Sequence, residues 1–342
     1  MKRAAVVTMR DVARRAGLNV STVSRALDEA RAHMVGDETR VRVLQIASEL
    51  GYRRNDIARS LRMGRSGTVG IIVADITNPF VMSAIRGAEE VLDAAGVSTL
   101  LAETRDDHDR LTRVCQRLLD RCVDGILTSA AREGEQALWA RTVKELPVVL
   151  MLRTLGGLDL PAVINDDLTG GRLAAEHLVG ELGHTRVAQI VGPTDISSFV
   201  LRAQGFREAA LAGSAELLEW EIGKGERRKA GIELGRRACE LPERPTAVFA
   251  PTDEIAVGFL QGVRRCGLRC PEDVSIVGYY DSSLAELVDP PLTSVRIESH
   301  EVGRRAAGLL GSISADLPSP SGVDSMISLE PKLVTRASTR PR

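Results

Sequence analysis

Apolar positions follow two different periods along this chain. Over residues 8–50 they recur at helical spacing, whereas from residue 69 onward short continuous apolar runs alternate with further helical stretches. The first two helical stretches each place three apolar residues on one face: Val12, Ala13 and Ala16, then Val23, Ala26 and Leu27. We therefore expect a small all-helical head followed by a larger α/β body.

The boundaries of the first two helices are marked by capping residues. Thr8 and Asp11 have the spacing of a capping box, and Gly17 stands where a left-handed C-cap is wanted. Asn19 can cap a second helix that runs from Val20 to Leu27. Two short helices joined through a glycine turn predict a helix-turn-helix.

A third helix is predicted from Asp37 to Leu50. Its inward face is expected to carry Val41, Leu44, Ala47 and Leu50, and Gly51 is expected to end it.

Charge distinguishes this head from the rest of the chain. Residues 1–67 carry a net charge of +7 and the remainder carries −8, although the whole chain is close to neutral at −1. The exposed positions of the second helix are Ser21, Thr22, Ser24 and Arg25, which suit phosphates and base edges. This combination favours a DNA-binding head. The alternative is a solvated helical cap with scattered arginines.

A short segment after the head, Asn55 to Arg62, has two interpretations. It is too short to be a stable helix alone, so it is either a plain linker or a helix that orders on DNA. In the second case Leu61 would enter the minor groove as an apolar wedge beside Arg62.

The body predicts a doubly wound parallel sheet in two halves. Ligands of such open α/β folds bind at the carboxyl ends of the strands, in a cleft between the halves. The expected strands are 69–74, 98–102, 124–129, 148–152, 187–191, 219–222, 247–250 and 274–277. The expected helices are 80–95, 109–121, one ending near 146, 170–182, 200–212, 229–240 and 254–266. The tail shows no heptads, so no coiled coil is expected.

Composition is ordinary for a globular protein, with 44% hydrophobic and 27% charged residues in 342. No apolar run approaches the ~18 residues of a membrane span, and we expect a cytoplasmic protein with no membrane contact. The five cysteines form no disulfide framework or metal-ligand spacing, so reduced, mostly buried thiols are expected, with no metal. His177 and His184 are expected to be structural.

Enzyme signatures are absent from the sequence. There is no glycine-rich phosphate loop, dinucleotide fingerprint, nucleophile elbow or paired-histidine zinc motif. The acidic pairs Asp106-Asp107 and Asp166-Asp167 are expected to be solvated or to cap helices. We therefore expect a regulator without catalysis or a cofactor.

The head sequences TMRDVARRAGLNVSTVSRAL and VGDETRVRVLQIASELGYRRNDIARSL resemble the LacI/GalR family of transcription factors. The resemblance implies that Val20 and Ser21 read bases, that Arg25 contacts a base, and that Leu61 enters the minor groove. Arg54 and Gly36 depart from the family pattern, at the places of a proline and of a Ser/Thr cap. The full set expected to contact DNA is Thr8, Arg10, Asn19, Val20, Ser21, Thr22, Arg25, Asn55, Arg59, Leu61 and Arg62.

The body resembles the same family through several short motifs, which are Asn78-Pro79-Phe80, Arg202-x-x-Gly205-Phe206, Thr252-Asp253 and the stretch Pro271 to Tyr279. This resemblance implies a periplasmic-binding-protein type I fold that binds small effectors between its halves. The expected effector residues are Ala74, Phe80, Leu152, Phe199, Arg202, Thr252, Asp253, Tyr280 and Asp281.

Several acids and amides that a sugar site would use are missing from these positions: Leu152, Thr252 and Tyr280 replace them. We therefore expect an anionic or partly apolar ligand contacted by Arg202, such as a sugar derivative. The alternative is that Arg202 simply pairs with Asp281 and that any response to an effector is weak.

The expected organisation is a DNA-binding head at 1–54, a hinge at 55–67 and an effector-binding and dimerisation body at 68–342. We expect a homodimeric regulator, a repressor of a palindromic operator, whose affinity for double-stranded DNA depends on a small-molecule effector. The alternative is a ligand-binding receptor with the same body and no transcriptional role.

Overall fold

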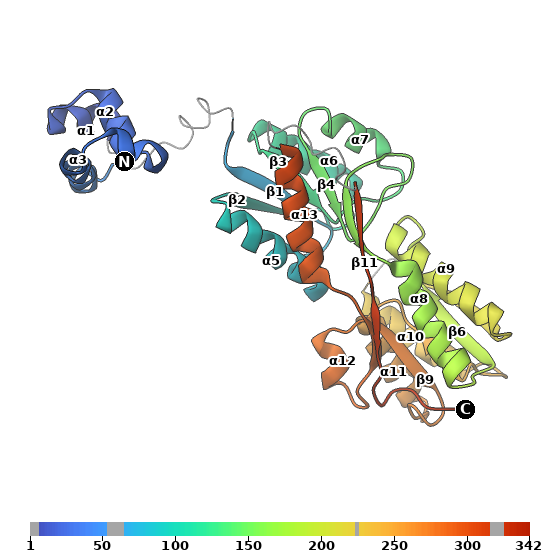
Figure 1. Cartoon of the computed structure of the whole chain (residues 1–342). Helices are drawn as coiled ribbons and strands as arrows, with labels where there is room; N and C mark the ends of the chain where they lie inside the picture. The colour runs from blue at the N-terminus through green and yellow to red at the C-terminus, as the bar shows by residue number, and fades with distance from the viewer. Residues whose placement is uncertain (1–6, 53–64, 223–225, 315–324) are drawn as a thin grey trace, which may run out of the picture. The chain divides into compact units, whose positions relative to one another are not determined.

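The computed structural model describes residues 7–52, 65–222, 226–314 and 325–342. The chain forms two compact units, Met1–Ser66 and Gly67–Arg342, and each is considered by itself (Figure 1).

The first unit is a small helical bundle. Its elements are α1 (Met9–Ala16), α2 (Val20–Ala26), the 3₁₀ segment η1 (Glu29–Met34) and α3 (Asp37–Glu49). The predicted inward faces of α1 and α2 are confirmed, because Val12, Ala13, Ala16, Val23, Ala26 and Leu27 are all buried in one cluster. Gly17 and Gly51 take left-handed backbone angles, with φ of 66° and 64°, where a side chain would be strained.

The predicted inward face of α3 is wrong in two positions. Val41 and Leu44 are 64% and 45% exposed, whereas Val43 is fully buried beside Ala47. Val41 and Val43 are both apolar and lie on nearly opposite sides of this helix, so periodicity alone does not decide which of them is buried. Val43 and Ala47 lie on the side of α3 that packs against α1 and α2.

The second unit contains two parallel sheets. The first has the order β11-β5-β4-β3-β1-β2, and the second has β12-β10-β9-β8-β6-β7. The first sheet consists of β1 (Thr68–Val73), β2 (Ser98–Glu103), β3 (Gly125–Thr128), β4 (Val148–Met151), β5 (Ala162–Asn165) and β11 (Met326–Leu329). The second consists of β6 (Arg186–Val191), β7 (Glu216–Glu221), β8 (Ala247–Phe249), β9 (Ser275–Tyr280), β10 (Thr293–Arg296) and β12 (Lys332–Val334). Among the described strands, only β12 pairs antiparallel to its neighbour.

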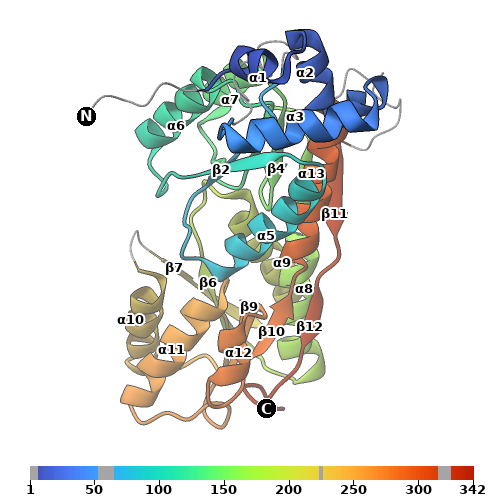
Figure 2. The same cartoon turned by 90° about the vertical axis from the view of Figure 1, so that its left-hand side faces the viewer.

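Helices cover both faces of each sheet, as a doubly wound fold requires. In the first half α5 (Pro79–Ala94) and α13 (Ser299–Ser314) pack side by side, and α6 (His108–Asp120) and α7 (Gln136–Thr142) enclose a separate core (Figure 2). In the second half α8 (Asp167–Ala175), continued by the π-helical turn η2 (Glu176–Glu181), packs on α9 (Ser197–Ala212). There α10 (Arg227–Cys239) and α11 (Asp253–Arg265) enclose a core, and α12 (Ser283–Leu287) follows β9.

The chain crosses between the halves three times. It passes from β5 to α8, returns from β10 to α13, and passes again from β11 to β12. The first half is therefore completed by α13 and β11, which come from the far end of the chain (Figure 1).

Glycines let α8 and α9 approach each other closely. A Cβ atom at Gly171 would lie 2.0 Å from the backbone oxygen of Arg202, and one at Gly205 would lie 1.9 Å from that of Leu168. No side chain fits at either position. This close approach brings Asp167, at the start of α8, beside Arg202 on α9.

The helices and strands predicted within the described residues up to β9 are found, although the strand expected at 219–222 is β7 at Glu216–Glu221, and the short strand β5 was not expected. Nothing was predicted for α12, β10, α13, β11 or β12. Two further expectations need correction. Of the five free thiols only Cys115 and Cys270 are buried, so they are not mostly buried. Asp167 is 3% exposed and is not solvated, although Asp166 and Asp107 do cap helices as expected.

Candidate functional site

The second helix of the head presents a small polar surface. Val20, Ser21 and Arg25 are exposed on α2, while the opposite face is buried. Asn19 holds the start of this helix, since its side-chain oxygen accepts hydrogen bonds from the backbone and the hydroxyl of Ser21, both at 3.0 Å. The guanidinium of Arg25 has no ion pair within the described residues.

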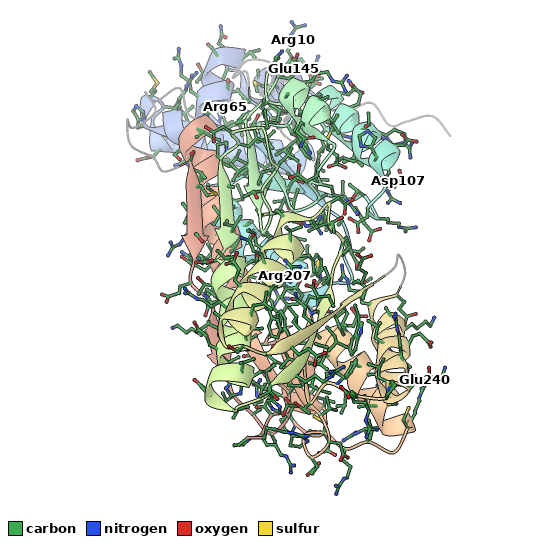
Figure 3. The ribbon with its side chains drawn as sticks, turned by 90° about the vertical axis from the view of Figure 1, so that its right-hand side faces the viewer. Arg10, Arg65, Asp107, Glu145, Arg207 and Glu240 are labelled. Carbon is green, nitrogen blue, oxygen red and sulfur yellow. The ribbon has the colours of Figure 1, made fainter. Side chains whose placement is uncertain are left out.

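The start of α1 is also capped by a side chain. The carboxylate of Asp11 accepts hydrogen bonds from the Thr8 hydroxyl at 2.6 Å and from the Thr8 amide at 3.0 Å. The hydrogen bond from that hydroxyl lowers the pKa of Asp11. Arg10 projects from the same helix (Figure 3). Thr8 and Arg10 are exposed and Thr22 is half-buried, whereas Asn55, Arg59, Leu61 and Arg62 lie outside the described residues.

In the body, Arg202 has an acidic partner. Its Nε donates to Asp167 Oδ1 at 2.7 Å, and its Nη1 donates to the Pro251 carbonyl at 2.9 Å and to the Tyr280 hydroxyl at 3.2 Å. Both members of the ion pair are buried. Burial opposes the charge on Arg202, but the Asp167 carboxylate outweighs it and raises the pKa of Arg202. The expectation that Arg202 lacks an acid is therefore wrong, and so is its alternative pairing with Asp281.

Aromatic rings surround the Arg202 guanidinium. Its Cζ lies 3.9 Å from the centre of the Tyr279 ring, 4.9 Å from Tyr280 and 5.3 Å from Phe199. The Tyr279 hydroxyl donates to Asp167 Oδ1 at 2.8 Å. Phe80 of α5 then stacks on Tyr280, with ring centres 4.2 Å apart. Four of the expected effector residues thus form one cluster, which joins the two halves.

Asp253 is held inside the second half. Its carboxylate accepts from the Ser294 hydroxyl at 2.5 Å and from the Ser282 amide and hydroxyl at 2.7 and 2.8 Å. Burial raises the pKa of Asp253 to about 6. The neighbouring Thr252 caps α11 by accepting from the Ile255 amide at 3.2 Å.

The remaining expected effector residues lie in other surroundings. Asp281 pairs with Arg296 at 2.6 Å and with Arg336 at 2.6 Å, and its side chain is 2% exposed. Ala74 is buried in an apolar core of the first half, and Leu152 is buried in the apolar cluster shared by both halves.

A cavity of about 530 Å³ lies between the halves. Its walls come from the carboxyl ends of the parallel strands, the position expected for a ligand in this fold. The lining residues are Arg105, Asp106, His108, Arg132, Glu133, Gly134, Glu135, Pro193, Asp195, Ile196, Phe199, Ile222 and Arg227. Among the expected effector residues only Phe199 belongs to this lining.

Arg132 connects the two walls of the cavity. Its Nη2 lies 2.6 Å from Asp195 Oδ2 in the second half, and its Nη1 lies 2.9 Å from Asp106 Oδ1 in the first half. The adjacent Glu133 amide donates to the Asp195 carbonyl at 2.9 Å. Burial opposes the charge on Arg132, but the hydrogen bond with Asp195 and the two acidic charges raise the pKa of Arg132.

Sequence reasoning missed most of this lining. The sequence does carry a usable signal for some of them, because several lining residues follow the end of a parallel strand within a few positions. These residues are Arg105, Arg132, Asp195 and Ile222. The pairing of Asp167 with Tyr279 and Arg202 joins residues 35 and more positions apart, so no spacing rule points to it.

Neither a metal site nor a membrane-spanning helix is found in the described part of the chain. The described part of the chain holds no group of three His, Cys, Asp or Glu residues that could bind a metal ion. His177 and His184 are structural, as predicted: each is buried and bonded to a threonine, Thr339 at 3.1 Å and Thr246 at 2.8 Å. No described helix is both long and apolar enough to cross a bilayer.

Comparison with known proteins agrees with these two units. Residues 8–55 match the model of the lacI family of bacterial regulatory proteins, and residues 175–339 match the periplasmic binding protein-like domain. The ribose operon repressor of Escherichia coli strain K12 is 32% identical over 308 residues, which are 89% of this chain and 92% of that protein.

Two solved structures show the same architecture. The lac repressor dimer bound to operator superposes with a TM-score of 0.86 over 98% of this chain and 99% of that chain, at 24% identity. A LacI-family regulator from Enterococcus faecium with bound ribose gives a TM-score of 0.69 over 80% and 99%, at 28% identity.

The chain is a DNA-binding transcriptional regulator with a periplasmic-binding-protein-like body. It belongs to the LacI family, and the relatives found are transcriptional repressors and regulators rather than enzymes.

Proposed function

We propose that this regulator is a homodimeric repressor that binds a palindromic operator through two heads. The observation that carries this proposal is α2, which presents Val20, Ser21 and Arg25 on one exposed face above a buried apolar face. Short hydroxyls and a guanidinium suit phosphates and base edges of the major groove. A head with net charge +7 strengthens its attraction to DNA.

The body of the regulator is proposed to bind the effector. Its cavity between the halves takes a small effector of the sugar type, as the ribose repressor relatives and the ribose-bound regulator suggest. An effector changes DNA affinity only if it prefers one arrangement of the two halves over another. The contacts that would differ between arrangements are those of Arg132 with Asp195 and of Phe80 with Tyr280.

The hinge is assigned by family resemblance. Leu61 would insert at the centre of the operator and Arg62 would contact the minor groove. Leu61→Ala should reduce DNA bending and affinity while the head stays folded. Equal bending by both proteins in a gel-phasing assay would contradict this role.

Binding of the full-length protein to palindromic duplexes from its own promoter region tests the DNA-binding proposal. Fluorescence anisotropy at two salt concentrations should give two chains per duplex and a strong salt dependence. Arg25→Ala should cost about 1–3 kcal/mol and relax the preference at one base pair of each half-site. Arg207→Ala, on α9 of the body, is the matched control and should leave DNA binding unchanged (Figure 3).

If no palindromic duplex is bound above the level of an unrelated duplex, even in low salt, the operator assignment fails. If Arg25→Ala binds with unchanged sequence preference, Arg25 does not read a base.

A further inference from the structure

Glycines bring the helices α10 and α11 of the second half into backbone contact. The two helices lie side by side and run in the same direction, because each follows one of the parallel strands β7 and β8 (Figure 2). A Cβ atom added at Gly231 would lie 3.1 Å from the carbonyl carbon of Gly258. One added at Gly235, a turn further along α10, would lie 3.0 Å from the Cα of Gly262. The two helices therefore stay close over at least one turn.

The register of this contact places two cysteines opposite each other. Residues four positions apart lie on the same face of a helix. The residue four positions after Gly235 is Cys239, and the residue four positions after Gly262 is Cys266. Since Gly235 and Gly262 face each other, the two cysteines form the next facing pair, at the ends of α10 and α11.

Both thiols are oriented into this contact. The Cys239 Sγ donates to the Gly235 carbonyl at 3.1 Å, and the Cys266 Sγ donates to the Gly262 carbonyl at 3.5 Å. The two thiols are also within hydrogen-bonding reach of each other. Burial, and after it the hydrogen bond with Cys266, raises the pKa of Cys239 to about 12.

Such a contact suits a disulfide. A disulfide joins Cα atoms about 4.4–6.8 Å apart, whereas most packed helices keep their axes about 8–10 Å apart. Here the backbones touch at Gly235 and Gly262, one turn before the cysteines. The two sulfurs can therefore bond with little movement of either helix.

The other cysteines lie in different surroundings. Cys115 and Cys270 are buried, and Cys122 is exposed but follows α6 in the first half. Cys266 is exposed and Cys239 is half-buried, so a small oxidant in water reaches this pair.

We propose that Cys239 and Cys266 are a reversible oxidation site, at which a peroxide joins the two thiols in a disulfide between α10 and α11. Cys266 reacts first, because it is the exposed thiol and Cys239 stays protonated. Its sulfur attacks one oxygen of hydrogen peroxide, the O–O bond breaks, and a sulfenic acid and one water form.

Cys239 completes the reaction. Its sulfur attacks the Cys266 sulfur, the S–O bond breaks, and its proton leaves with the hydroxide as a second water. The two sulfurs together lose two electrons, which the peroxide gains. A dithiol reverses the reaction by thiol–disulfide exchange.

The disulfide should stabilise the second half. It closes a loop that contains β8 and most of α11, and this restricts the unfolded chain more than the folded one. The oxidation state of the two thiols thus sets the stability of the second half.

Oxidation of the full-length protein by hydrogen peroxide, followed by alkylation of the remaining thiols, tests the proposal. The intact protein should lose two hydrogens and regain them with dithiothreitol. Trypsin cuts at arginines between Cys239, Cys266 and Cys270, so peptide mass spectrometry identifies the pair that is joined. The oxidised protein should unfold at a temperature about 5 °C higher than the reduced protein.

Three variants connect these effects to the named thiols. Cys239→Ser and Cys266→Ser should each abolish the disulfide and the increase in unfolding temperature. Cys122→Ser removes an exposed thiol of the first half, is the matched control, and should retain both effects. Because Cys266 is exposed, its variant remains informative if Cys239→Ser fails to fold.

Three results would overturn the proposal. The first is no disulfide between Cys239 and Cys266 at any peroxide concentration that leaves the protein folded. The second is a disulfide of either residue with another cysteine in its place. The third is an oxidised protein that unfolds at no higher temperature than the reduced one. None of these measurements involves DNA, so they leave the proposed DNA-binding function to its own test.

Discussion

The rings of Phe80 and Tyr280 stack face to face, with centres 4.2 Å apart and planes 7° from parallel. Phe80 belongs to α5 of the first half and Tyr280 ends β9 of the second. Tyr280 takes this place with φ of 108°, a strained angle for a residue with a side chain. The contact therefore stabilises one arrangement of the two halves at a conformational cost.

A double-mutant cycle measures this stacking contact. Phe80→Leu and Tyr280→Leu, alone and together, should show a coupling of about 0.5–1.5 kcal/mol in urea unfolding. The coupling arises because each single change already removes the stack. A coupling indistinguishable from zero would show that the rings do not hold the halves together.

Arg132 makes another contact between the halves. Arg132→Met should lower the free energy of unfolding by about 1–3 kcal/mol, because it leaves Asp106 and Asp195 without their shared partner. Asp106 and Asp195 are partly exposed, so the loss of unfolding free energy should be smaller at high salt. Thermal unfolding at two salt concentrations checks both expectations.

Arg207→Met is a control for this change, since it removes an exposed arginine paired with Glu219. Exposed pairs contribute about 0–1 kcal/mol, so its effect should be the smaller of the two. If Arg132→Met and Arg207→Met lower the free energy of unfolding equally, the contact between the halves stabilises the protein no more than an exposed ion pair does.

The buried carboxyl of Asp253 should make the stability of the protein depend on pH. Its folded-state pKa of about 6 lies above the ordinary aspartate value of 3.8, so the folded chain binds this proton more tightly than the unfolded chain. The contribution of Asp253 to stability is therefore greatest below pH 4 and is lost as the pH rises through 6. At about 1.4 kcal/mol per pKa unit, the change is roughly 2–3 kcal/mol.

The comparison of wild type with Asp253→Asn isolates that contribution. Urea unfolding between pH 4 and pH 7 should show that the variant loses less stability over this range. Asp273→Asn is the control, since hydrogen bonding by the Arg269 amide lowers the pKa of the exposed Asp273 from its ordinary value of 3.8. The contribution of Asp273 is lost only below that value, so this variant should follow the wild type over the measured range. Parallel curves for wild type and Asp253→Asn would contradict the assigned pKa.

The helices α8 and α9 lie so close together that a single methyl group added between them should destabilise the protein. Gly205→Ala would place Cβ 1.9 Å from the Leu168 backbone oxygen, so the helices must separate, at a cost of about 1–3 kcal/mol. The shift would also disturb the Arg202–Asp167 pair. Thermal unfolding gives the stability change.

The matched control is a helical glycine with space around it. Gly308 is exposed on α13, and a Cβ there meets nothing within 4 Å. Gly308→Ala should therefore raise stability by up to about 1 kcal/mol, through helix propensity. Destabilisation by both substitutions would remove the steric explanation.

The sequence predicts most of the fold because its signals are local. Capping by Asn19, the left-handed turn at Gly17 and the buried strand Val69–Val73 depend on neighbouring residues alone. The stripe of α3 that faces inward was chosen wrongly because two apolar stripes compete. Elements such as β11 and α13 were not predicted, since their identity depends on partners far away in the chain.

The candidate site was less predictable for the same reason. The residues expected from resemblance are largely committed to one another or to other partners, as Arg202 is to Asp167 and Asp281 is to Arg336. The cavity is lined instead by loops that follow the strands. Which of their side chains meet across it depends on three-dimensional pairing, as for Arg132 with Asp106 and Asp195.

The three crossings between the halves have a consequence for synthesis on the ribosome. The head can fold as soon as it emerges, because its core uses only residues near the start of the chain. The first α/β half must wait, since Val302, Ala306 and Leu310 of α13 and the strand β11 complete its core and its sheet. A nascent chain therefore exposes a finished DNA-binding head long before the part that would control it exists.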